Sequence, residues 1–108
     1  MHRTDFTIED QTVPGYIVSG EWGVHRARQK NHLWVTRHRG TGLAVGNGAA
    51  TLGWSTRKEA AAMASYLDQV LPETRNPDCE EFLKDPQNRE RLANAVSLGK
   101  TMARCARL

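Results

Sequence analysis

The sequence predicts a single α+β domain over residues 1–108, β-rich at 13–54 and helical at 56–108. In the first half, short runs of β-branched and aromatic residues alternate with Gly, Pro and Asn. In the second half, apolar residues recur at helical spacing. A length of 108 residues is enough for one domain with its own core. We therefore expect an antiparallel sheet of three to five strands, packed against a helix at about 57–71 and C-terminal helices.

The predicted strands follow one another through short turns, which favours antiparallel pairing. In chain order they are placed at 16–18, 22–28, 32–38, 43–45 and 49–54. Turn residues separate them at 29–31, at 39–42 and at Gly46-Asn47-Gly48. Neither face of 22–28 or 32–38 is purely apolar, so the register of these two strands stays open.

The helix over 57–71 is predicted from its start, its face and its end. Thr56 and Glu59 have the spacing of a capping box, in which each side chain accepts from the other residue's N–H. Pro72 ends the helix. Between them runs an apolar stripe of Ala60, Met63, Ala64, Leu67, Val70 and Leu71. This stripe must be buried, so we expect it to lie on the sheet.

Two further helices are expected after Pro72. A short one should start at Asn76-Pro77-Asp78, where Asp78 and Glu81 again have capping-box spacing. The last should start at Pro86, with Asp85 as its cap. Its expected buried stripe consists of Leu92, Val96, Met102, Ala103 and Ala106. Gly99 should weaken the middle of this helix by about 1 kcal/mol relative to alanine.

Basic residues are concentrated in two parts of the chain. Residues 22–58 hold seven Lys or Arg and no Asp or Glu, and residues 86–108 hold five against one acid. Acids dominate 59–85, although the net charge of the whole chain is only +3. Such a layout creates a local positive potential that the net charge conceals. We therefore expect a negatively charged partner.

The sequence contains no recognised catalytic, metal-binding or cofactor-binding motif. The glycines between Gly40 and Gly48 lack the following helix and the Lys-Ser/Thr pair that a phosphate loop needs, so they are interpreted as hairpin turns. His25, His32 and His38 lack zinc spacing. We expect no metal, no cofactor and no enzymatic activity. An enzyme built around the histidines is a remaining alternative.

Cysteine usage and hydropathy suggest the compartment. Cys79 and Cys105 form no CxxC pair, so neither a disulfide framework nor a zinc site is indicated. No apolar run approaches the roughly 18 residues of a membrane span, and the first residues lack the apolar stretch of a secretory signal. We therefore expect a cytoplasmic protein that does not enter a membrane.

Three tryptophans, Trp22, Trp34 and Trp54, flank the basic strands. Core packing accounts for them most simply. The alternative is that one or two stack on nucleic-acid bases or on partner side chains. Trp34 fits this alternative because it lies between His32 and the basic run at 37–39.

These patterns predict a small non-catalytic protein that binds nucleic acid or a nucleoprotein through a basic sheet surface. The candidate contact residues are His25, Arg26, Arg28, Lys30, Trp34, Arg37, His38 and Arg39. A secondary basic face is expected from Lys100, Arg104 and Arg107. If five of these cations neutralise phosphates, log K against log salt on duplex DNA should have a slope of about −4 to −5.

Residues 23–70 carry a family resemblance. Basic strands and a glycine turn are followed there by a helix entry that reads Trp54-Ser55-Thr56-Arg57-Lys58-Glu59-Ala60. This arrangement resembles the small arm-DNA-binding domains of phage integrases, over about half of the chain. The resemblance implies a three-stranded sheet packed on one helix, a sheet face that enters the major groove, and a phage or mobile-element setting.

A protein partner is the alternative to nucleic acid. An inhibitor or adaptor, for example an anti-CRISPR or anti-restriction protein, would use the same basic residues against an acidic protein surface. Arginine and tryptophan are also enriched at the energetic centres of protein interfaces. A homodimer is possible if the stripe of the last helix packs on a second copy.

Overall fold

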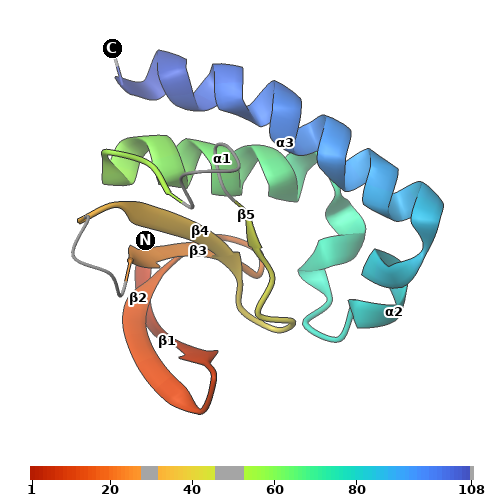
Figure 1. Ribbon diagram of the computed structural model, residues 1–108, viewed down its shortest axis with the longest axis horizontal. Helices are drawn as coiled ribbons and strands as arrows, with labels where there is room; N and C mark the ends of the chain where they lie inside the picture. Colours follow the sequence, from red (N-terminus) through yellow and green to blue (C-terminus); the bar gives the residue numbers. More distant parts are fainter. Residues whose placement is uncertain (28–31, 46–52, 108) are drawn as a thin grey trace.

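The computed structural model describes residues 1–27, 32–45 and 53–107, with only the backbone described at position 107 (Figure 1). Five strands form one antiparallel sheet in the order β1-β2-β3-β4-β5. They are β1 (His2–Ile8), β2 (Gln11–Ser19), β3 (Trp22–Arg26), β4 (Trp34–His38) and β5 (Ala44–Val45). The helical part comprises α1 (Arg57–Val70), the 3-10 helix η1 (Pro72–Arg75), α2 (Glu80–Lys84) and α3 (Pro86–Arg107). The predicted α+β class with an antiparallel sheet is confirmed.

The elements form layers, with α1 between the sheet and α3 (Figure 1). Trp22 and Val24 of β3 are fully buried against the apolar stripe of α1, and the Thr36 hydroxyl of β4 donates to the Ala60 carbonyl at 2.8 Å. The capping box predicted at Thr56 and Glu59 is present with both of its hydrogen bonds. The predicted helix start is therefore confirmed, but Val70, predicted to be buried with the apolar stripe, is 36% exposed at the end of the helix.

The sheet is larger at its N-terminal side than the sequence analysis predicts. No strand was expected before residue 13, yet β1 pairs along its whole length with β2. Pro14-Gly15, which precedes the predicted first strand at 16–18, lies inside β2, with Pro14 paired to Asp5. Only Phe6 of β1 is buried, so the strand lacks the alternating apolar pattern that identifies strands in a sequence.

On the face of β3 turned away from α1, the Phe6 side chain of β1 covers Gly23 and His25. Phe6, 1% exposed, lies over two residues that have no side chain, Gly15 and Gly23. A Cβ at Gly15 would lie 2.7 Å from the Phe6 ring, and one at Gly23 would lie 2.8 Å from it. These glycines therefore create the space that lets a phenylalanine of the edge hairpin reach the centre of the sheet.

Small residues let α3 approach α1 closely. Ala95 and Ala103 are buried, and a Cβ at Gly99 would lie 2.5 Å from the Met63 sulfur. Gly99 thus allows the two helices to pack closely. The sequence analysis predicted only its cost in helix propensity. Met102, predicted to be buried, is 50% exposed, because the closely packed face of α3 is the one with small side chains.

The start of α2 differs from its prediction. The helix begins at Glu80 with Cys79 as N-cap, and no side chain caps it. The amide of Asp78 instead donates to the Asn76 side chain at 2.9 Å, so Asn76 closes the turn. The start of α3 agrees better, because the Asp85 carboxylate accepts from the Gln87 amide at 2.8 Å. The segments predicted as turns at 29–31 and 46–48, and most of the strand at 49–54, lie outside the described residues.

Candidate functional site

Strand register decides which predicted contact residues share a surface. Arg26 pairs with Trp34, on the face of the sheet that carries Trp22 and Val24. His25 pairs with Val35, and Arg37 pairs with Gly23, on the opposite face. The structure therefore separates the predicted set into two faces instead of one basic surface. Arg28 and Lys30 lie outside the described residues.

His38 is in the interior, which corrects its predicted role as a surface contact. Its Nε2 lies 2.6 Å from the Thr74 carbonyl oxygen, so this nitrogen carries the proton and donates it. Its Nδ1 then accepts from the Thr41 amide at 3.1 Å, and its ring meets Trp22 edge-on at 5.0 Å. His38 fixes the turn after β4 and η1 to the core.

Cys79 lies 3.6 Å from His38, the one cysteine–histidine approach in the described part of the chain. A nucleophilic pair needs an unprotonated imidazole nitrogen towards the thiol. The nitrogen nearest to Cys79 is the protonated Nε2, and burial raises the pKa of the Cys79 thiol. This pair is therefore arranged for packing and not for attack on a substrate.

His25 is also buried, 1% exposed, and its predicted surface role is corrected in the same way. Its Nδ1 donates to the Arg26 carbonyl at 2.8 Å, and its Nε2 accepts from Arg37 Nε at 3.0 Å. Phe6 covers the ring at a centroid distance of 5.3 Å. Burial lowers the pKa of His25, the Arg26 carbonyl raises it, and the positive charge of Arg37 lowers it.

The His25–Arg37 contact predicts a pH-dependent stability. Because the pKa of His25 is lower in the folded protein than the ordinary value of 6.5, the unfolded chain binds more protons below that pH. The free energy of unfolding should therefore fall as the pH drops from 7.5 to 5, since a proton on Nε2 removes the bond from Arg37 and places two cations together. Urea denaturation at several pH values measures this. His25→Gln, which keeps an acceptor but does not titrate, should give a flatter profile, and equal slopes for both proteins would contradict the prediction.

Arg39 is paired within the protein. Its guanidinium forms an ion pair with Glu21 at 2.7 Å and donates to the Thr4 hydroxyl at 3.0 Å. Arg37 likewise donates to His25 and to the Gly42 carbonyl. Both side chains thus hold parts of this fold together, although Arg39 itself is exposed.

A different group of cations lies on the other face, around Trp34. The Arg26 guanidinium is 5.0 Å from the centroid of the Trp34 ring. Arg57, the first residue of α1, is 5.9 Å from the same ring and 5.5 Å from the ring of Tyr16. Arg3 pairs with Tyr16 across β1 and β2. We call these five residues the arginine–aromatic cluster.

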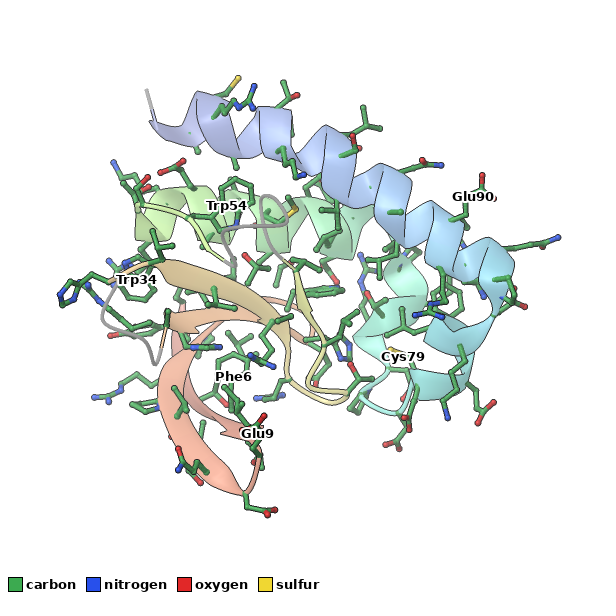
Figure 2. The ribbon with its side chains drawn as sticks, in the orientation of Figure 1. Phe6, Glu9, Trp34, Trp54, Cys79 and Glu90 are labelled. Atoms are coloured by element: carbon green, nitrogen blue, oxygen red, sulfur yellow. The ribbon has the colours of Figure 1, made fainter. Side chains whose placement is uncertain are left out.

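A recess of about 190 Å³ opens in this cluster. Its walls are formed by Arg3, Pro14, Gly15, Tyr16, Arg26 and Trp34. The nearest acid along the same strand face is Asp5, two residues from Arg3 and paired with Pro14. Figure 2 shows Trp34 at one end of the sheet, far from Cys79 and α2 at the other.

The arginines of the cluster are not neutralised by the part of the protein that the structure describes. Ion pairs there involve Arg39, Arg75, Lys84 and Arg91, and none involves Arg3, Arg26 or Arg57. Arg26 makes one long hydrogen bond, 3.5 Å, to the His32 carbonyl. The cluster therefore presents uncompensated positive charge next to aromatic rings.

The predicted secondary basic face lies near this end of the molecule. The C-terminal end of α3 and the start of α1 are at the same end (Figure 1). Lys100 is partly buried and Arg104 is exposed one turn later. The side chain of Arg107 is outside the described residues. Of this predicted face, Arg104 is thus the described residue that is exposed at this end of α3.

Sequence reasoning found two cluster members, Arg26 and Trp34, and missed Arg3, Tyr16 and Arg57. Arg57 was interpreted as part of a helix start, and Arg3 belongs to a strand that was not predicted. The pairing of β1 with β2 would have revealed Arg3, because it places that residue beside Tyr16.

In the described ranges, no group of three or more His, Cys, Asp or Glu side chains is placed to hold a metal ion. Helices of the length and apolar character needed to cross a membrane are likewise absent from those ranges. Comparison with family models, curated proteins and solved structures gives no significant match to this chain.

Proposed function

We propose that this chain is a small non-catalytic protein that binds nucleic acid or a nucleoprotein through the arginine–aromatic cluster. One observation supports this most directly: three arginines surround two aromatic rings on one surface, without an acidic partner in the described residues. Phosphate groups, like carboxylates, match the arginine side chain, which binds them through two parallel hydrogen bonds. The phage or mobile-element setting implied by the integrase resemblance remains a prediction.

The rings contribute to this function by holding the guanidinium groups in place. An arginine stacked on an aromatic face keeps its N–H edge free for a phosphate. Because Arg57 contacts both Tyr16 and Trp34, and Arg26 contacts Trp34, less side-chain freedom is lost when a phosphate binds. The cluster is therefore partly organised for a polyanion before binding.

With three arginines in the proposed site, the affinity should depend less steeply on salt than the sequence analysis predicts. Three phosphate contacts predict a slope of log K against log salt of about −2 on single strands and about −3 on duplex DNA. Contacts to phosphate alone do not specify a sequence, so binding to mixed nucleic acids should be observed.

Arg26→Ala with Arg57→Ala tests the proposal. The double variant should bind a fluorescent oligonucleotide at least tenfold more weakly, and its salt slope should be smaller by about 2. Fluorescence anisotropy titrations at several salt concentrations measure both quantities.

The matched control is Arg75→Ala with Arg91→Ala, which removes the same charge from arginines that are ion-paired with Asp68 and Glu73. It should keep most of the affinity. Equal losses in the two double variants, or a wild-type affinity independent of salt, would reject the arginine–aromatic cluster as the binding site.

A second candidate function, an inhibitor or adaptor that binds a protein, is favoured by a different observation. An apolar groove of about 650 Å³ runs between the β4–β5 turn and the helices α2 and α3, with Leu43, Val45, Leu92 and Val96 in its walls. Grooves of this kind accept apolar side chains of a partner. A pull-down with and without nuclease separates the two functions, because only a directly bound protein partner is retained after digestion.

A further inference from the structure

The recess of the arginine–aromatic cluster indicates the form of nucleic acid that it binds. Resting on the proposed function, we propose that the cluster selects single-stranded over double-stranded nucleic acid. One unpaired base lies against Tyr16 and Trp34, and the adjoining phosphates lie on Arg3, on Arg26 and, outside the recess, on Arg57.

Strand pairing produces this combination. Tyr16 of β2 is paired with Arg3 of β1, and Trp34 of β4 is paired with Arg26 of β3. Side chains directly opposite each other in an antiparallel pair have Cβ atoms only about 4.5–5.5 Å apart. Each ring therefore has a guanidinium beside it, and both pairs line the same recess.

Tyr16 and Trp34 both line the recess, and both are only partly buried. Arg57 contacts Tyr16 and Trp34 but is not among the residues that line the recess, so it supports the rings from outside it. Pro14 and Gly15 form the rest of the wall and carry no long side chain that fills the space. Trp34 is only partly buried, unlike Trp22 and Trp54.

The concave shape favours a single strand. Reading a duplex from its major groove requires an element that protrudes, such as a helix or a two-stranded ribbon. A recess instead receives a group that projects from the ligand, and an unpaired, unstacked base is such a group. Stacking of a base on an aromatic side chain tolerates any sequence, since every base has a π-face.

Anisotropy titrations with a 15-nucleotide oligo-dT and a 15-base-pair duplex test the preference at one salt concentration. Wild-type protein should bind oligo-dT at least fivefold more tightly. Trp34→Leu should weaken oligo-dT binding by about 5- to 150-fold, the range of one base–aromatic stack, and change duplex binding less than twofold. Trp34→Phe, which keeps a ring, should restore most of the oligo-dT affinity.

A measurement on the unaltered protein covers the case in which Trp34→Leu does not fold. Trp22 and Trp54 are buried at 0% and 2% exposure, so a base stacked on Trp34 should quench the emission of that tryptophan alone. Oligo-dT should therefore quench part of the fluorescence, and the duplex should not.

The outcomes separate this inference from the proposed function. Equal binding of oligo-dT and duplex, both lost in Arg26→Ala with Arg57→Ala, would overturn single-strand selection and leave the proposed function intact. Absence of binding to either probe would overturn both. Quenching by oligo-dT that persists unchanged in Trp34→Phe with Tyr16→Leu would place the base elsewhere and overturn the recess as its site.

Discussion

Trp22→Ala should lower the free energy of unfolding by about 3–5 kcal/mol, the usual cost of deleting a large aromatic side chain from a core. Trp22 is fully buried and faces the apolar stripe of α1. Its Nε1 also donates to the Thr74 hydroxyl at 2.8 Å, and its ring contacts His38. One side chain thus joins the sheet to α1 and to η1, so its loss affects the sheet and both of these helices.

Urea denaturation followed by circular dichroism measures this loss, and phenylalanine variants separate the hydrogen bond from the volume. Trp22→Phe leaves the buried Thr74 hydroxyl without the Trp22 donor. Among the described residues, the buried Nε1 of Trp54 has no hydrogen-bond partner, so Trp54→Phe loses none. We expect Trp22→Phe to be the more destabilising change by about 1 kcal/mol or more. The reverse order would show that the Trp22–Thr74 bond does not stabilise the fold.

Local patterns predicted the helices well because the information lies within a few residues. The capping box at Thr56 and Glu59 and the apolar stripe after it need only near neighbours to act. Local patterns predicted less well which residues of α3 are buried. Met102 is more apolar than Ala95, yet Ala95 is buried and Met102 is exposed. The reason is that α3 approaches α1 closely at Gly99, where only small side chains fit. The distance between two helices cannot be inferred from the sequence of one of them.

Strand β1 was not predicted because its partners supply most of its stability. His2–Ile8 holds one buried residue, Phe6, and its backbone is paired by β2. Neither the two glycines that make room for Phe6 nor the depth of its burial can be read from the strand itself. Because Arg3 lies on this strand, the sequence analysis also missed Arg3 as a residue of the candidate site.

The sequence predicted which kinds of residue form the candidate site, but it did not predict all of the residues that belong to it. The surplus of Arg in 22–58 predicted a local positive charge, and Arg26, Trp34 and Arg57 of the cluster lie in that range. Register, which the sequence left open, placed Arg37 on the opposite face. An acid outside the basic segment, Glu21, then neutralised Arg39.

Phe6→Ala is expected to cost about 3–5 kcal/mol of unfolding free energy, comparable with Trp22→Ala although Phe6 lies on the other face of the sheet. The ring fills the space over Gly15 and Gly23, and an alanine would leave a cavity there. The matched control is Thr7→Ala, whose side chain is exposed on the neighbouring position of β1, with an expected change within about 0.5 kcal/mol.

The same substitution should also alter the response to pH, which tests the reason for the loss. Without the Phe6 ring, His25 gains access to water, so the pKa of His25 should return towards its ordinary value. Stability should then depend less on pH between 7.5 and 5 than it does in the wild-type protein. Urea denaturation at the two pH values measures this. A low stability combined with an unchanged pH profile would mean that Phe6 supports the hairpin of β1 and β2 without shielding His25, and the account of this face of the sheet would be wrong.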